Sequence, residues 1–259
     1  ILNEGTGDVR LDGLIDNPIG QTRIENRGGG IYFDGGAGDA LRSNKVDLIA
    51  ETAIGSSSQR LAVDLVWSRG RDTDLDALAE GGDIWLDLTG RVRDPNSANS
   101  RFDGGTIAAA GDVDILFQSS VQETQPTGNA GGVSVSVNSG ASTDYFEHFR
   151  PDTTTGPSPL DYRLFADTAT ATTLDGGYVF ELISGENIYI AAANPGAADP
   201  RIDLTSHTDH GDTGQIDVLL NGSITLTEIA GVYTIHEIQS QIGDIDLTTL
   251  DGDAAVGFI

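Results

Sequence analysis

The chain has no cysteine and no methionine among its 259 residues, and Lys45 is its only lysine. The absence of cysteine excludes a disulfide framework, a thiolate metal site and a cysteine nucleophile. No apolar run approaches the roughly 18 residues of a membrane-spanning helix, so no helical span is expected. Acidic residues number 40 against 14 basic ones. The resulting formal charge of -26 excludes a nucleic-acid partner, because it repels phosphate.

Glycine and aspartate are abundant instead. The chain has 34 glycines, and 30 of its 40 acidic residues are aspartates. Both residue types disfavour helix interiors and favour tight turns. No segment shows the apolar stripe of an amphipathic helix, whereas short alternations of apolar and polar residues occur throughout. The composition therefore predicts an all-β protein.

A five-residue unit recurs: glycine, a small or polar residue, an apolar residue, any residue and a second apolar residue. Gly82-Asp83-Ile84-Trp85-Leu86 is a clear copy. The alternation places both apolar side chains on one face, toward a core, and the polar side chains on the other. The leading glycine permits a corner between short strands of roughly 3–6 residues. Further copies begin at Gly7, Gly111, Gly214, Gly222, Gly231 and Gly243.

The spacing of these glycines indicates stacked coils. The step from Gly185 to Gly214 has the same length as the step from Gly214 to Gly243, and the step from Gly222 to Gly243 is shorter. Coils of about 20–25 residues that stack roughly 4.8 Å apart, with loops of variable length, account for such steps. We therefore predict that residues 1–259 form one right-handed parallel β-solenoid of roughly ten to twelve coils, with a β-sandwich or jelly roll as the alternative. Because the pattern is cut at both ends, a segment of a larger protein is expected.

Two stretches depart from the repeat. Residues 91–106 are polar and rich in turn formers, and they predict a loop excursion. Residues 138–165 hold five aromatic residues and three prolines, and they predict a second excursion. This segment is either an arm that packs on the side of the rod or a carbohydrate-binding ledge formed by Tyr145, Phe146 and Phe149.

The run "GSITLTEIAGVYTIHEIQSQIGDIDLTT", from Gly222 to Thr249, resembles the filamentous-haemagglutinin-like exoproteins, a family of very long bacterial surface and secreted proteins. The run "LIAETAIGSSSQRLAVDL", from Leu48 to Leu65, is similar to another unit of that family. Residues 91–106 and 138–165 have no counterpart in it. The resemblance implies a right-handed β-helix that serves as the passenger of an extended adhesin or surface filament. It supplies no catalytic residues.

Several clusters could hold a cation. Carboxylate oxygens on turns suit Ca²⁺, and imidazole together with carboxylate can hold Zn²⁺. In each case the alternative is a solvated turn or strand face. The candidate metal ligands are Asp39, Asp72, Asp74, Asp76, Asp251 and Asp253 for calcium, and His207, Asp209, His210 and Asp212 for zinc.

Trp85 is the remaining candidate for sugar binding. It is expected to point outward, because Ile84 and Leu86 point inward, and an exposed indole can stack on a sugar ring. A covering loop from the 91–106 stretch is the alternative. Asp112 and Asp114 form an outward pair whose spacing suits acid–base work on a glycosidic bond. Solvated strand face is the simpler interpretation of that pair.

These observations predict a non-catalytic structural or adhesive rod segment of a large secreted or cell-surface bacterial protein. The expected partners are the rest of the parent chain and a glycan or protein on a host or neighbouring cell. Exposed strand edges also predict end-to-end self-association. Two alternatives remain open: a calcium-stiffened extracellular filament or surface-layer protein, and a β-helix polysaccharide lyase or glycoside hydrolase.

Overall fold

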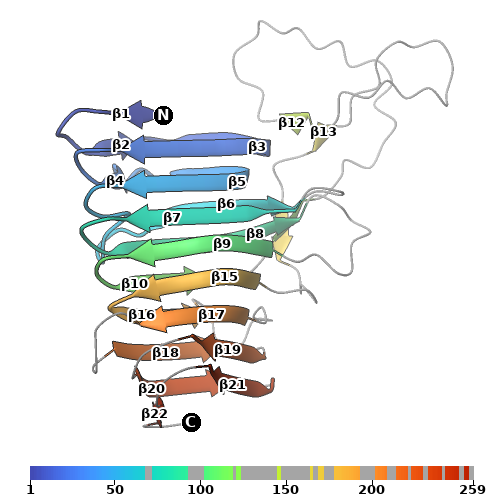
Figure 1. Ribbon diagram of the computed structural model, residues 1–259. Coiled ribbons are helices and arrows are strands. Elements are labelled where there is room, and N and C mark those ends of the chain that lie inside the picture. Colours follow the sequence, from blue (N-terminus) through green and yellow to red (C-terminus); the bar gives the residue numbers. More distant parts are fainter. Residues whose placement is uncertain are drawn as a thin grey trace, which may run out of the picture.

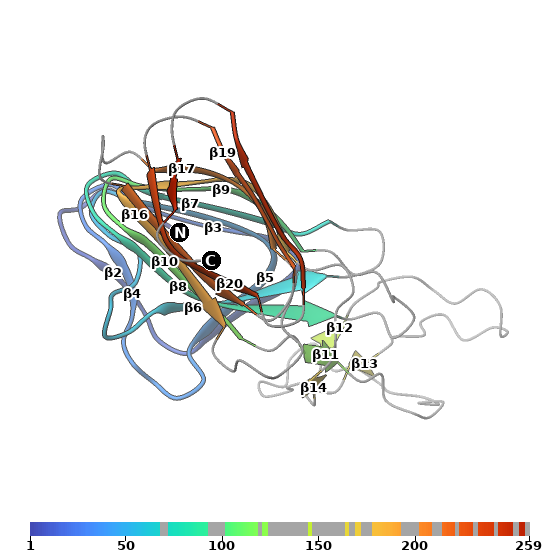
Figure 2. The ribbon, with the colours of Figure 1, turned by 90° about the horizontal axis from the view of Figure 1, so that it is seen from below.

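The protein is all β in the part of the chain that the computed structural model describes, and no helix occurs there. That part comprises residues 1–67, 72–92, 102–118, 178–192, 214–220, 223–229, 233–240 and 243–250, together with strand backbone at 121–123, 145–146, 164–165, 169–171, 202–208 and 254–256. Eighteen of the described strands form one continuous sheet that curls around a common core (Figures 1 and 2).

The strands stack in columns, and within a column each strand pairs with the strand one layer further along. The first column contains nine described strands, each parallel to the next. In order down the stack they are β1 (Leu2–Asn3), β3 (Leu14–Asn26), β5 (Ala40–Ala50), β7 (Asp74–Ala79), β9 (Phe102–Ala109), β15 (Tyr178–Gly185), β17 (Ile202–Thr208), β19 (Ile224–Glu228) and β21 (Ile245–Thr249). At about 4.8 Å between neighbours, nine strands give a stack about 40 Å long.

A second column runs alongside the first. Its strands are β2 (Val9–Leu11), β4 (Ile31–Phe33), β8 (Ile84–Val92), β10 (Val113–Phe117), β16 (Asn187–Ala192), β18 (Gly214–Leu220), β20 (Tyr233–Ser240) and β22 (Ala254–Val256). β2 and β4 form a two-stranded ladder outside the eighteen-stranded sheet, and Ile54 links it to β8 through parallel bridges to Ile31 and Ile84.

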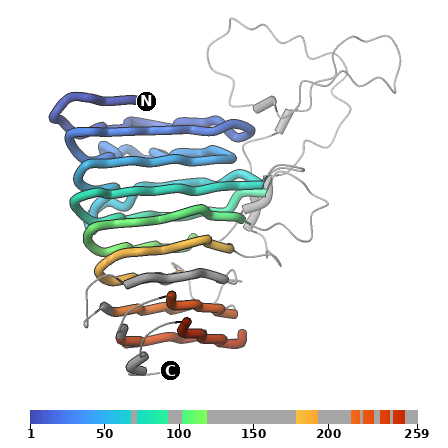
Figure 3. Tube along the Cα trace, in the orientation of Figure 1, coloured from blue at the N-terminus to red at the C-terminus, as the bar shows by residue number. Residues whose placement is uncertain are grey.

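A third column closes the N-terminal part. It consists of the first halves of β3 and β5, then β6 (Leu61–Trp67), the second half of β8, and β11 (Val121–Glu123). The chain therefore returns to the same place in the first column after each circuit, one layer further down (Figure 3). Leu48 pairs with Ala77 in this way, and Leu226 pairs with Leu247 in a shorter circuit near the other end.

The core follows from the repeated apolar positions. In the second column Ile31, Ile54, Ile84, Val113, Ile188 and Ile216 stack on one another and are fully buried. Burial of each such side chain contributes about 1.5–3 kcal/mol. The prediction that the third and fifth residues of each unit point inward is confirmed at Ile84 and Leu86, and again at Val113 and Ile115.

One layer is far longer than the others. Ile107 of β9 pairs with Ile183 of β15, so this circuit takes more than twice the length of chain that separates Leu48 from Ala77. Within this interval β11 pairs antiparallel with β14 (Ala169–Ala171), and β12 (Tyr145–Phe146) pairs antiparallel with β13 (Leu164–Phe165). Among the described residues the first column contains nine strands, against the roughly ten to twelve coils predicted for the whole chain.

Two further predictions are corrected by the strands. β3 spans 13 residues and β5 spans 11, well beyond the expected length, because each passes from the third column into the first. The register between them shifts between Asn17 and Gln21 of β3. The loop predicted over 91–106 is wrong at both ends. Arg91 and Val92 complete β8, and 102–106 belong to β9, whereas 93–101 lie outside the described residues.

Candidate functional site

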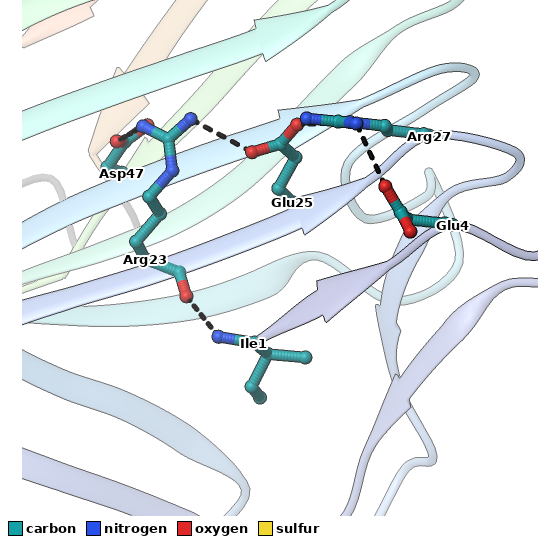
Figure 4. Close-up of polar contacts among 6 residues, drawn as sticks. All are labelled: Ile1, Glu4, Arg23, Glu25, Arg27 and Asp47. Atoms are coloured by element: carbon teal, nitrogen blue, oxygen red, sulfur yellow. Dashed lines mark hydrogen bonds and ion pairs between the residues drawn. The ribbon is translucent and has the colours of Figure 1, made fainter.

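The most elaborate group of charged side chains among the described residues lies on the outer face of β3. Strand alternation turns Arg23 and Glu25 to the same side, and Arg27, which directly follows the strand, lies on that side too. Glu25 accepts hydrogen bonds from Arg23 Nη2 at 3.0 Å and from Arg27 Nε at 2.6 Å. Arg27 Nη1 also contacts Glu4 Oε1 at 3.1 Å, and Arg23 pairs with Asp47 of β5 (Figure 4). The hydrogen bond from Arg27, followed by that from Arg23, lowers the pKa of Glu25.

A hollow of about 270 Å³ opens beside this group. It is lined by Glu25, Asn26, Arg27, Ile49, Glu51 and Glu80. Asn26 is fully buried, and its Nδ2 donates to the Gly30 carbonyl at 2.7 Å and to the Gly7 carbonyl at 3.1 Å. The wall at this residue is therefore rigid. Glu51 and Glu80 are exposed, and they follow the paired residues Ala50 and Ala79, so they occupy equivalent positions in adjacent layers.

The aspartates of β7 were expected to hold calcium, and the structure gives them other contacts. Asp76 Oδ1 accepts the Thr106 backbone N–H at 2.8 Å. Asp74 lies 3.6 Å from Lys45 Nζ, and its pKa is raised by burial and then by the neighbouring Asp76 charge. Asp72 precedes the strand. Within the described ranges, no group of three or more histidine, aspartate and glutamate residues is arranged to hold a metal ion.

The carboxylate of Asp39 binds backbone N–H groups. Its Oδ1 accepts the Gly13 N–H at 2.8 Å and its Oδ2 accepts the Gly36 N–H at 2.7 Å, so both carboxylate oxygens bind backbone. The structure describes little of the other candidate metal ligands. His207 lies in β17, of which only the backbone is described, and the predicted ligands Asp209, His210, Asp212, Asp251 and Asp253 lie outside the described residues.

The aspartate that follows glycine in the repeat has a role that the sequence did not reveal. Asp83 Oδ1 accepts the backbone N–H of Asp112, the equivalent residue one layer on, at 2.9 Å. Asp112 Oδ1 then accepts from Asn187 Nδ2 at 2.8 Å, and Asn187 Oδ1 accepts the Gln215 N–H at 3.2 Å. These side chains link four layers at one corner of the stack. The regular steps between the Gly-Asp pairs of the repeat were the available signal.

Trp85 points outward as predicted, but the Arg60 guanidinium lies over the face of its ring. The Arg60 guanidinium carbon lies 5.2 Å from the ring centroid, and Arg60 donates to Asp114 Oδ1 at 2.6 Å and to Asp114 Oδ2 at 2.9 Å. Arg60 therefore covers the indole and ties together two layers that are distant in the sequence. Whether residues 93–101 also cover the ring is outside the part of the chain that the structure describes.

The aromatic ledge predicted in 138–165 is described only in part. Tyr145 and Phe146 form β12, and their pairing partners are Phe165 and Leu164 of β13. Their side chains, and Phe149, lie outside the part of the chain that the structure describes.

Asp87 is a half-buried carboxylate on the outer side of β8, and its Oδ1 atom is inaccessible to solvent. Among the described residues its Oδ1 accepts no hydrogen bond. Burial raises its pKa, and this effect is only partly offset by a hydrogen bond from Gln118 and by the charge of Arg60. A raised pKa in the folded state means that the folded chain binds a proton more tightly than the unfolded chain does.

Asp87→Asn is therefore expected to raise the thermal midpoint at neutral pH. The stabilisation from proton binding to Asp87 is complete below the unfolded pKa of about 3.9 and is lost as pH rises through the higher folded pKa. Asparagine does not ionise, so the variant does not lose this stabilisation as pH rises. The gain should amount to a few degrees, as about 1 kcal/mol produces in a chain of this size, and it should vanish near pH 3. Thermal melts of both proteins across this range check it, and a constant difference at every pH would contradict the assignment.

Comparison of the chain with known protein families, with curated proteins and with solved structures found no match. None of the described residues forms a helix long and apolar enough to cross a membrane. The geometry of the stack and its outer faces is therefore the basis for the functional proposal.

Proposed function

We propose that the chain is a structural and adhesive rod segment of a large secreted or cell-surface protein, and that its curled parallel sheet is a right-handed β-solenoid. The observation that carries the proposal is the unbroken parallel pairing of nine strands around one apolar core. Each layer contacts the layers on either side, and together they bury one continuous apolar core along the stack.

The outer faces support an adhesive role. Solenoids present extended lateral surfaces along their length, and such surfaces are used for binding. In this chain the first column presents rows of charged side chains on β3, β5 and β7, at a regular spacing of about 4.8 Å. The resemblance of the C-terminal run to filamentous-haemagglutinin-like exoproteins points to the same function and to an extracellular location.

Beads coated with the folded chain test this proposal against the enzymatic alternative. The proposal predicts that coated beads are retained on a panel of cell surfaces or glycan arrays more than beads coated with an unrelated protein of similar charge. It also predicts no release of reducing ends or unsaturated products from polyuronates and neutral glycans. Turnover of any of these polysaccharides, or retention equal to that of the control beads, would overturn it.

A further inference from the structure

An apolar strip crosses the outer face of the first column. Ile49, Leu78 and Ala108 occupy the same register position on β5, β7 and β9. They point outward because the residues beside them in the chain, such as Leu48 and Ala77, are buried. Leu78 is 38% exposed, which makes it one of the few large apolar side chains so open to solvent among the described residues.

Carboxylates border this strip on both sides, and the two sides differ. Asp47 is paired with Arg23, and Asp76 accepts the Thr106 N–H, so this side is engaged within the protein. On the other side, no described cation lies within ion-pair distance of Glu51 or Glu80. These two side chains extend from adjacent layers, about 4.8 Å apart, where like charges repel each other.

The hollow lies beside this second side, and Ile49 is the residue of the strip that lines it. Arg27 also lines it, and the charge of Arg27 is already engaged by Glu25 and Glu4. The volume of the hollow, about 270 Å³, is below the range of about 300–1,000 Å³ typical of small-molecule pockets. It therefore suits a single side chain better than a cofactor. Ile49 offers an apolar surface to an aliphatic stem, and Glu51 and Glu80 offer acceptors to a charged head group. Lysine and arginine have this combination of stem and charge.

We propose that this strip docks a basic, extended segment of a partner protein, with one lysine or arginine side chain in the hollow. The inference names a partner class for the adhesive part of the proposed function and rests on it. A second copy of this chain does not fit, because each copy carries a formal charge of -26 and the copies repel each other.

A fluorescent peptide of alternating lysine and alanine tests the proposal, with a glutamine–alanine peptide as the uncharged comparison. We expect only the lysine peptide to bind in a fluorescence anisotropy titration, and its affinity to fall with added salt. Glu51→Gln combined with Glu80→Gln should weaken binding about tenfold, since both acceptors of the charged head group lose their charge. Leu78→Ser should also weaken binding.

The matched control is Asp244→Asn combined with Asp246→Asn. It removes the same charge from exposed positions around β21, at the other end of the stack. The proposal predicts that this control binds the peptide like the unaltered chain. Equal losses in both double variants would show attraction to the overall charge alone and would overturn it. Retention of coated beads on cells without any binding of the lysine peptide would overturn the docking surface and leave the proposed function standing.

Discussion

Phe117→Ala is expected to lower the free energy of unfolding by about 3–5 kcal/mol, the usual loss for removal of a buried phenylalanine. Phe117 is 1% exposed at the end of β10. Its ring centroid lies 4.6 Å from that of Tyr178 and 6.2 Å from that of Phe180. These aromatic residues join β10 to β15 across the longest layer, so a cavity here weakens the contact between the two parts of the stack.

Equilibrium denaturation of the variant checks this value, with Phe117→Leu as the control. Leucine keeps most of the buried volume, so its loss should stay below about 1.5 kcal/mol. A loss below about 1 kcal/mol for the alanine variant would mean that β10 and β15 do not share a packed core at Phe117.

Gly55→Ala is expected to have the second largest effect. Gly55 has φ of 67°, a left-handed conformation that costs a residue with a Cβ roughly 1–2 kcal/mol. The added Cβ would also lie 2.8 Å from the Leu61 nitrogen and press directly on the Trp85 carbonyl oxygen of the next layer. The backbone of one layer would have to move away from the other. We expect a total loss of about 3 kcal/mol or more, measured as a drop in the denaturation midpoint.

Gly38→Ala is the control that separates the cost of the left-handed backbone conformation from the cost of the close contact at Gly55. Gly38 has a similar φ of 91°, but no atom lies within 4 Å of the position that its Cβ would take. This control should therefore lose only the roughly 1–2 kcal/mol of conformational strain. If both variants lost the same amount, the close approach of the two layers at Gly55 would be disproved.

The repeated alternation was enough to predict which side chains form the core. It predicts Ile84, Leu86, Val113 and Ile115 as inward residues, and all four are buried. The alternation succeeds because a period of two fixes the face of each residue whatever the partner strand is. It carries no information on how the layers are joined across the chain, and for this reason the contact of Arg60 with Asp114 was not foreseen.

The glycines of β9 show why the strand boundaries were missed. The sequence pattern treats Gly104 and Gly105 as turn formers, whereas both lie inside the strand. A Cβ at Gly104 would press on the Phe180 ring, and one at Gly105 would press on the Asp76 carboxylate. These glycines make room for side chains of neighbouring layers. A sequence pattern cannot distinguish this use of glycine from a turn, because the neighbours belong to other circuits of the chain.

The candidate site was less predictable than the core. The hollow is lined by residues of β3 and β5 and by residues that directly follow β3, β5 and β7, and the residues that face one another are separated by one circuit of the chain. The sequence motifs point instead to aspartates close together in the chain, such as Asp72, Asp74 and Asp76. Strand alternation places such neighbours about 7 Å apart along one face, where they bind backbone and single cations of adjacent layers rather than one shared ion.

Cysteine cross-linking tests the register of the stacked layers, since this sequence contains no cysteine that would interfere. Ile49→Cys with Leu78→Cys places two thiols one layer apart, and Ile49→Cys with Ala108→Cys places them two layers apart. A disulfide requires Cα atoms about 4.4–6.8 Å apart, whereas two layers span about 10 Å. We expect mild oxidation to close a disulfide in the first variant and to leave both thiols free in the second. Free thiols in the first variant, or equal oxidation of the two, would contradict this register.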